Sequence, residues 1–172
     1  MLRLLKGAAA AVLLLSLGSC TVKYSATGAS VEPDAKTVNI RFVENRAPIN
    51  NPTLAQRLTE RLRQKIQSQT KLTQVNDDNA DYEFRATVTG YSFSNAAVTN
   101  VDQAATSRLT VTMNVVFVKR VGVDKKGWTQ SFSQSADFQA SQLPSQVENS
   151  LLDETIIPQI TDAIFNRAFA NW

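Results

Sequence analysis

Histidine is absent from the 172-residue chain, and cysteine occurs once. Without histidine, the protein has no Ser-His-Asp or Cys-His catalytic site and no imidazole ligand for a metal. A single cysteine rules out an internal disulfide and a cysteine-rich zinc site. An enzyme would have to work with carboxylates, lysine, tyrosine and hydroxyl groups alone, so the composition favours a protein that is not an enzyme.

Glycine is scarce as well, with six residues, and none of them forms a phosphate-binding loop or a dinucleotide-binding fingerprint. Two pairs of adjacent acids are the remaining candidates for acid–base chemistry. Asp77-Asp78 lies in an asparagine-rich turn, and Asp153-Glu154 lies in an early turn of a predicted helix, where acids interact favourably with the helix dipole. Both placements favour a structural role, and we predict no catalytic site, no cofactor and no metal.

Charge is missing from residues 7–19, which follow a short basic start. This arrangement is typical of a secretory signal, and the run is shorter than the ~20 apolar residues that span a membrane. It ends in LGSC at residues 17–20, which resembles the bacterial lipobox, in which the cysteine is acylated after cleavage before it. The alternative is an ordinary signal peptide with a chance cysteine. The lipobox interpretation predicts a signal peptide over residues 1–19 and lipidation of Cys20, and several acyl chains give a stable membrane anchor.

Removal of residues 1–19 from the 172 leaves a mature chain of 153 residues. Because Arg3 and Lys6 leave with the signal, the 18 basic residues fall to 16 against 15 acids, and nucleic acid is not expected as a partner. The mature length fits one domain with a real core. We assign residues 20–35 to the lipidated N-terminus and tether, and residues 36–172 to a single domain.

Period-two alternation of apolar and polar residues predicts four strands, each with one core side and one polar side. The first covers residues 37–43, with Val38, Ile40 and Phe42 on the apolar side. The other three lie near residues 82–89, 108–117 and 128–138. The polar sides are mostly neutral: serine, threonine, asparagine and glutamine make up 52 of the 153 mature residues, which suits water or another polar protein wall.

Two helices complete the predicted fold. The Asn-Pro pair at residues 51–52 has the form of an N-cap and a first-turn proline, and an apolar stripe at four-residue spacing follows to about residue 69. Ser145 and Glu148 have the spacing of a capping box for a second helix, which Pro158 should kink or split. The predicted fold class is α+β: two helices packed on one face of a four-stranded, mostly antiparallel sheet, in the order β-α-β-β-β-α.

Three basic residues, Arg57, Arg61 and Lys65, recur every four residues beside the apolar stripe of the first helix. A basic edge beside an apolar face suits an anionic lipid surface. Glu60 and Gln64 dilute the charge, so a solvated helix face is the favoured interpretation.

The connection between the last two predicted strands carries four basic residues against one acid, Asp124. The four are Lys119, Arg120, Lys125 and Lys126. Basic side chains at a loop tip bind phosphate groups through charge-assisted hydrogen bonds. The alternative is that the charges only keep the turn solvated and guard the sheet edges. Both interpretations stay open on the residues alone.

Several stretches resemble the LptE family of lipopolysaccharide-assembly lipoproteins, in the order and spacing in which they follow one another. They are NNPTL at 50–54, LRQKIQSQT at 62–70, GY at 90–91, RLTV at 108–111, QSFS at 130–133 with ADF at 136–138, and IFNRAFANW at 164–172. The resemblance covers nearly the whole mature chain. The ending looks like the short branch of the family, without the long polar C-terminal tail of some members.

The resemblance implies a non-enzymatic lipoprotein that is anchored to the inner leaflet of the outer membrane and faces the periplasm. Proteins of this family plug the large β-barrel protein LptD, assist its assembly and help to insert lipopolysaccharide into the outer leaflet. The resemblance also implies contacts with lipopolysaccharide phosphates, for which we select the basic loop of Lys119, Arg120, Lys125 and Lys126. No acid directly follows Cys20, which by analogy with lipoprotein sorting favours outer-membrane delivery.

Two other functions stay open on the sequence. A free-standing, periplasm-facing lipoprotein would bind a small ligand or a cell-wall component. A lipoprotein hydrolase would need an active site without histidine or a thiol. A stable one-to-one complex with a barrel separates the plug from the free-standing lipoprotein, and turnover that is lost when an acid is replaced would identify the hydrolase.

Overall fold

The computed structural model describes residues 29–49, 51–96 and 106–170. The predicted signal peptide, Cys20 and most of the predicted tether lie outside the described residues. Within the described ranges, no helix is both long enough and apolar enough to cross a membrane.

Three long strands form the centre of the sheet: β4 (Tyr82–Ala96), β5 (Thr106–Lys119) and β6 (Trp128–Gln139). β4 pairs with β5, and β5 with β6, in antiparallel register, as the alternation predicts. The register of β4 shifts between Val88 and Gly90. The apolar side therefore passes from even to odd positions, and the side chains beyond the shift still reach the core.

Three shorter strands extend the sheet: β1 (Thr37–Ile40), β2 (Glu44–Asn45) and β3 (Thr73–Gln74). β1 pairs in parallel with β3 and β4, and β2 pairs in parallel with β4, which gives the order β3-β1-β4-β5-β6 with β2 beside β4. The α+β class is confirmed. The prediction of a four-stranded, mostly antiparallel sheet in the order β-α-β-β-β-α is wrong in strand number and order, because the sheet is mixed and has six strands.

The predicted strand over residues 37–43 divides because its backbone leaves the ladder after Arg41. Arg41 N–H still donates to Phe84 O at 3.0 Å, but Val43 N–H donates to the Thr59 hydroxyl of the first helix at 2.9 Å. Val43 is buried and Phe42 is 59% exposed, the reverse of the predicted alternation. The group that interrupts the strand lies in another element, so the local pattern gives no sign of it.

Helix α2 (Leu54–Gln69) begins two residues after Pro52, the predicted first helical position, and its N-cap is Thr53 rather than Asn51. The chain first makes a turn at Pro52 and Thr53, across which Asn51 Oδ1 accepts hydrogen bonds from Thr53 N–H at 3.0 Å and from Leu54 N–H at 3.1 Å. The buried side is the predicted stripe, whose members are at most 1% exposed: Leu54, Leu58, Leu62 and Ile66.

The C-terminal helix is continuous but irregular. Its first part, α3 (Pro144–Ser150), passes into a π-helical turn, η1 (Leu151–Ile156), and then into α4 (Ile157–Phe169). Pro158 stands in the first turn of α4 and has no N–H to donate to the preceding turn. The irregularity predicted at this proline takes the form of the π turn directly before it, and the helix continues.

The N-terminus of α3 lacks the predicted capping box. Its N-cap is Leu143, which makes no side-chain cap hydrogen bond. Pro144 takes the first helical position, where its missing N–H costs nothing, and this places Ser145 inside the first turn. Glu148 accepts a hydrogen bond from Tyr91 of β4.

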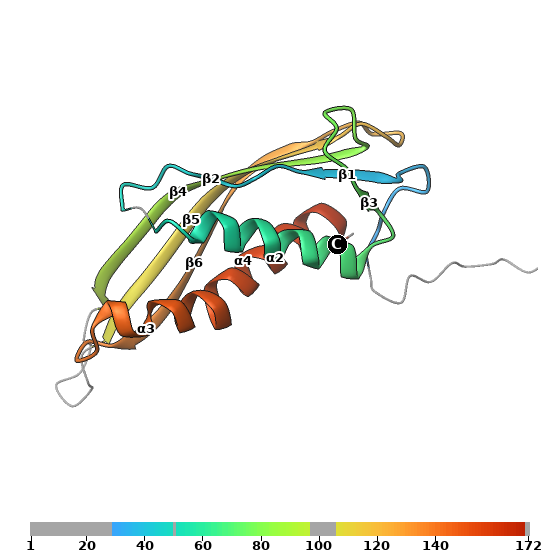
Figure 1. The fold of residues 1–172 in the computed structure, drawn as a ribbon. Coiled ribbons are helices and arrows are strands. Elements are labelled where there is room, and N and C mark those ends of the chain that lie inside the picture. Colours follow the sequence, from blue (N-terminus) through green and yellow to red (C-terminus); the bar gives the residue numbers. More distant parts are fainter. Residues whose placement is uncertain (1–28, 50, 97–105, 171–172) are drawn as a thin grey trace, which may run out of the picture.

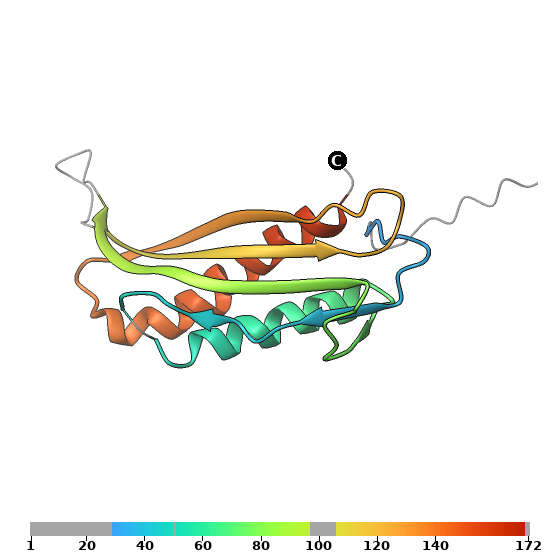
Figure 2. The same ribbon diagram turned by 90° about the horizontal axis from the view of Figure 1, so that it is seen from above.

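The two helices lie side by side on one face of the sheet, as predicted (Figures 1 and 2). Aromatic rings fill the space between the layers: Phe84 and Phe117 have centroids 4.8 Å apart, and Phe169 of α4 lies 6.1 Å from each. On the opposite face of the sheet, no described residue forms a helix. We call this side of the sheet the open face.

Candidate functional site

Neutral polar side chains cover the middle of the open face. They are Thr87, Thr110, Thr112, Asn114, Thr129, Ser131, Ser133 and Ser135. The strand register places seven of them opposite one another, whereas Thr129 lies opposite Val116, and the hydroxyls of Thr112 and Ser133 share a hydrogen bond at 3.0 Å. Each hydroxyl both donates and accepts, so this surface can bond to water or to a polar protein wall.

On the open face, the charged side chains of the three long strands occur only at its two ends, within the described residues. At one end, Arg108 donates to both carboxylate oxygens of Asp137 at 2.6 and 2.9 Å. These hydrogen bonds lower the pKa of Asp137 and raise the pKa of Arg108. Along the edge of β4, Glu44 of β2 lies opposite Thr87 and forms an exposed ion pair with Arg46, which follows β2.

Three arginines surround one carboxylate at the other end of the open face. We call them the guanidinium cluster, and its members are Arg41, Arg85 and Arg120 around Glu83. The Glu83 side chain has no exposed surface, whereas the three arginine side chains are between 31% and 49% exposed. Arg41 Nε donates to Oε1 at 2.5 Å, Arg120 Nη2 donates to Oε2 at 2.5 Å, and Arg85 donates to both oxygens at 2.7 and 3.1 Å.

The guanidinium cluster keeps Glu83 ionised. The hydrogen bonds from Arg85, and then those from Arg120 and Arg41, hold the pKa of Glu83 to about 2, although burial acts to raise it. Three positive charges against one negative charge leave the cluster positive, and Asp78, which pairs with Arg41 at 2.9 Å, offsets one more. Since each guanidinium carries five N–H donors and stays partly exposed, donors remain for an anionic group such as a phosphate.

The four residues of the predicted basic loop fall into two pairs. Arg120 belongs to the guanidinium cluster, and Lys119 at the end of β5 pairs with Glu32. The hydrogen bond to Glu32 raises the pKa of Lys119. Lys125 and Lys126 are exposed in the connection between β5 and β6. The structure therefore brings Arg120 to a cluster and leaves Lys125 and Lys126 in solvent.

Three residues of the cluster, Glu83, Arg41 and Arg85, are not among the residues predicted for the site. Glu83 and Arg85 occupy neighbouring positions on the polar side of one strand, so the alternation carries a signal for their pairing. Arg41 and Arg120 lie 42 and 37 residues from Glu83 in the chain. They reach it only because β1 and the end of β5 flank the start of β4.

Three of the four acids in the two adjacent pairs have structural partners among the described residues. Asp77 Oδ1 accepts a hydrogen bond from Asn79 N–H at 2.9 Å within their turn, and Asp78 pairs with Arg41. Asp153 accepts a hydrogen bond from Arg57 Nε at 2.9 Å. In the part of the chain that the structure describes, no three residues among aspartate, glutamate and cysteine come together as metal ligands.

A further polar contact, centred on Glu148 of α3, joins the helices to the second half of β4. Glu148 Oε1 of α3 accepts hydrogen bonds from the Tyr91 hydroxyl and from Asn51 Nδ2, both at 2.5 Å. Burial, and then the hydrogen bond to Glu148, raise the pKa of Tyr91. The contact holds the start of α2 and the start of the C-terminal helix against the sheet.

We expect Tyr91→Phe to lower the free energy of unfolding by about 1 kcal/mol, because it removes one charge-assisted hydrogen bond and keeps the ring in the core. Urea denaturation at pH 7 measures the change. Asn95→Ala, an exposed change further along β4, serves as a control and should stay within about 0.5 kcal/mol of the wild type. A Tyr91→Phe protein as stable as the wild type would show that the hydrogen bond contributes nothing.

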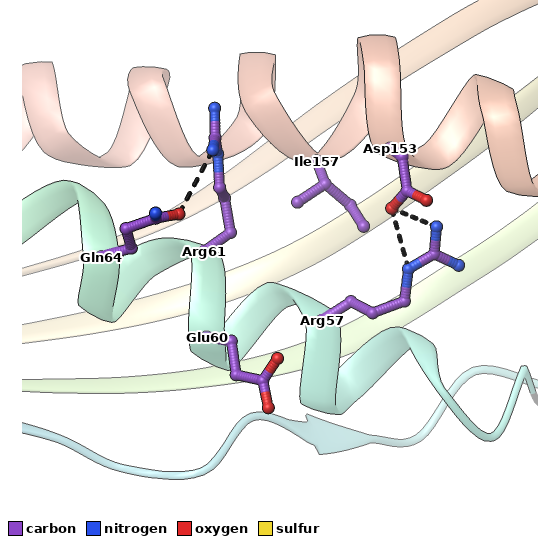
Figure 3. A pocket seen from close by; sticks show the side chains of 6 residues that line it. All are labelled: Arg57, Glu60, Arg61, Gln64, Asp153 and Ile157. Atoms are coloured by element: carbon purple, nitrogen blue, oxygen red, sulfur yellow. Dashed lines mark hydrogen bonds and ion pairs between the residues drawn. The ribbon is translucent and has the colours of Figure 1, made fainter.

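A groove of about 520 Å³ runs between α2 and the C-terminal helix (Figure 3). Its lining residues are Arg57, Glu60, Arg61, Gln64, Asp153 and Ile157. Arg57 crosses the groove to Asp153, and Lys65, one turn beyond Arg61, pairs with Asp162 of α4 at 2.9 Å. The basic stripe that the sequence suggested as a solvated face is therefore in part a set of contacts between helices.

The fold and its surfaces define a class of protein: a two-layer α+β domain with a neutral polar sheet face and a basic end. Residues 35–168 match the family model described as LptE, lipopolysaccharide-assembly. The chain belongs to the LptE family. Among curated proteins, no sequence relative was found.

Solved structures share the fold at low sequence identity. Protein XCC0632 from Xanthomonas campestris has a TM-score of 0.51 at 10% identity, covering 81% of this chain and 89% of its own. The hypothetical protein CT253 from Chlamydia trachomatis has a TM-score of 0.50 at 12% identity, covering 80% of this chain and 99% of its own. A minor lipoprotein from Acinetobacter baumannii has a TM-score of 0.48 at 18% identity, covering 78% and 95%. The first two similarities concern the fold alone.

Proposed function

We propose that this chain is a non-enzymatic outer-membrane lipoprotein that plugs an LptD-type β-barrel, assists its assembly and helps to insert lipopolysaccharide into the outer leaflet. Membership of the LptE family supports a role in lipopolysaccharide assembly. The observation that carries the plug is the open face, whose middle is polar and free of charge across three long strands.

A neutral polar face suits docking against the wall of a barrel lumen, which is itself polar. When such a face leaves water, its hydroxyl and amide groups exchange bonds to water for bonds to the wall at little net cost. A charged face would lose hydration that a neutral wall does not replace. The middle of the open face therefore fits a plug better than the charged outer sides of the helices do.

The basic end of the molecule is the proposed contact for lipopolysaccharide phosphates. It comprises the guanidinium cluster together with the loop residues Lys119, Lys125 and Lys126. Guanidinium and ammonium groups at this end would compete with the divalent cations that bridge phosphates of neighbouring lipopolysaccharide molecules. Because Lys119 and Arg120 already hold Glu32 and Glu83, we expect the exposed lysines and the outward N–H groups of the arginines to make the contact.

Lipidation of Cys20 would place this basic end near the membrane. The described chain begins at Ala29, which is buried, and Ser30 N–H donates to Phe169 O at 2.6 Å. The start of the described chain and the connection between β5 and β6 lie at the same end of the molecule (Figures 1 and 2). The eight residues between Cys20 and Ala29 reach at most ~28 Å, so the anchor would keep this end close to the bilayer.

A pull-down from the native outer membrane tests the proposal. The full chain is tagged at its C-terminus, extracted in mild detergent, and its partners are identified. We expect a large β-barrel protein at a one-to-one ratio. A protein that is recovered alone, or with cell-wall fragments, would contradict the plug and favour a free-standing lipoprotein.

We expect the double substitution Lys125→Ser/Lys126→Ser to weaken lipopolysaccharide binding about fivefold and to leave the melting temperature unchanged, because exposed loop changes usually cost under ~0.5 kcal/mol each. Arg120 and Lys119 are left in place, since their loss would also release Glu83 and Glu32. Binding is measured by titration of the purified protein with lipopolysaccharide at fixed salt. Lys36→Ser/Lys71→Ser removes the same charge from two other exposed positions. Equal weakening in both variants would show that only overall charge matters.

A further inference from the structure

Two ion pairs connect α2 and the C-terminal helix across the groove. Arg57 pairs with Asp153, and Lys65 pairs with Asp162. The helices run in the same direction, so the two ion pairs are about two turns apart on both helices. Arg61 lies on the same side of α2, one turn from each.

Between these two ion pairs, the C-terminal helix has no acid opposite Arg61. One turn after Asp153 the C-terminal helix presents Ile157, and one turn before Asp162 it presents Pro158. Arg61 Nη1 donates to Gln64 Oε1 at 3.3 Å, and no carboxylate among the described residues lies within ion-pair distance of its guanidinium. Figure 3 shows the Arg61 side chain extended toward the C-terminal helix and Glu60 turned the other way.

The π turn maintains this arrangement. Asp153 and Asp162 are nine residues apart, whereas Arg57 and Lys65 are eight apart. A π turn takes up one extra residue, so η1 allows both ion pairs to form. The gap opposite Arg61 is therefore held open between two closed pairs.

We propose that Arg61 receives an acidic side chain of a partner protein that enters this groove. The ion pairs on either side of Arg61 show that a carboxylate fits the spacing between the helices. Arg57 and Asp153 neutralise each other and Glu60 is turned away, so Arg61 leaves a single positive charge, which matches a singly charged carboxylate better than a doubly charged phosphate. A volume of about 520 Å³ admits such a side chain with its neighbours.

The identity of the partner rests on the proposed function: the acid belongs to the wall of the barrel. A plug enclosed by a barrel meets the wall on more than one side, so the groove and the open face serve the same complex. The planar guanidinium of Arg61 can bind a carboxylate through two parallel hydrogen bonds.

Charge reversal in the full-length lipoprotein tests the inference. Tagged Arg61→Glu is expected to retain about one-fifth of the barrel that the wild type retains in a mild-detergent pull-down, and Arg61→Lys more than half. Lys71→Glu, the same charge change at an exposed position just beyond α2, is the control and should retain the wild-type amount. Melting temperatures should agree among all four proteins, because the Arg61 guanidinium makes one long hydrogen bond, to Gln64 at 3.3 Å, and no ion pair among the described residues. If Arg61→Glu retains as much barrel as the wild type, the inference is wrong and the plug stands; if the wild type retains none, both are wrong.

A photocrosslinker at Gln64, inside the groove, identifies what enters it. We expect a crosslink to a barrel segment that contains an aspartate or glutamate, and replacement of that acid by arginine should restore binding of Arg61→Glu. A crosslink to lipopolysaccharide alone, or to a segment without an acid, would overturn the inference.

Discussion

Glu83→Gln is expected to lower the free energy of unfolding by about 3 kcal/mol at pH 7. The glutamine keeps the shape of the side chain but removes the negative charge that three guanidinium groups share. Those groups would then repel one another around a buried neutral amide, and breaking a buried ion pair by removing one partner costs about 3–5 kcal/mol. The partial exposure of the arginines, which lets water solvate them, keeps the expected loss at the lower limit.

The effect should disappear in acid. The pKa of Glu83 lies at about 2 in the folded protein, below its ordinary value of 4.5, so the folded state binds the proton less readily than the unfolded state does. The stabilisation is therefore complete above about pH 5 and is lost as the pH falls from 4.5 toward 2. The difference between these two pKa values corresponds to about 3 kcal/mol.

Urea denaturation of the wild type and Glu83→Gln at pH 7, 5 and 3 measures both effects. Other acids with lowered pKa values, such as Asp81 and Asp137, also lose stability in acid, but they do so equally in both proteins. Glu44→Gln, which breaks an exposed pair with Arg46, is the matched control and should cost less than about 0.5 kcal/mol. A gap between the wild type and Glu83→Gln that stays constant from pH 7 to pH 3 would contradict the ionised carboxylate.

Two lysines in the middle of the open face should abolish the barrel complex. Ser131 and Ser135 are both exposed on β6 and lie opposite Asn114 and Thr110 in the register. A lysine at each position must lose its hydration when the face docks, and a buried charge without a partner costs several kcal/mol. We expect Ser131→Lys/Ser135→Lys to retain less than one-tenth of the barrel that the wild type retains.

The same pull-down separates this effect from loss of folding. In solvent the lysines stay hydrated, so the melting temperature should change little. Gln67→Lys/Gln159→Lys adds the same charge on the exposed sides of the two helices and should retain the barrel. If the double lysine variant of β6 binds the barrel as well as the wild type, the open face does not dock in the lumen.

Local patterns predicted the helices and the long strands correctly. The stripe of α2 and the alternation of β4, β5 and β6 recur at fixed spacing, and burial of one side follows from that spacing alone. The division of β1 from β2 was not predictable, because the Thr59 hydroxyl that takes the amide of Val43 lies 16 residues further along the chain. The parallel pairing of β1 with β4 is likewise a choice between partners that alternation does not rank.

The candidate site was likewise predicted only in part. The sequence located the basic loop, since Lys119, Arg120, Lys125 and Lys126 are close neighbours in the chain. It did not show that Arg120 is held by a buried glutamate or that Arg61 faces a gap between two ion pairs.

The sequence by itself determined the two-layer α+β class and the neutral polar face of the long strands, and it predicts processing at Cys20, because each depends on residues near one another in the chain. Only the tertiary structure decided which charges meet. An ion pair forms between groups within about 4 Å in space, and Arg41, Glu83 and Arg120 come that close only after three strands from separate parts of the chain have paired.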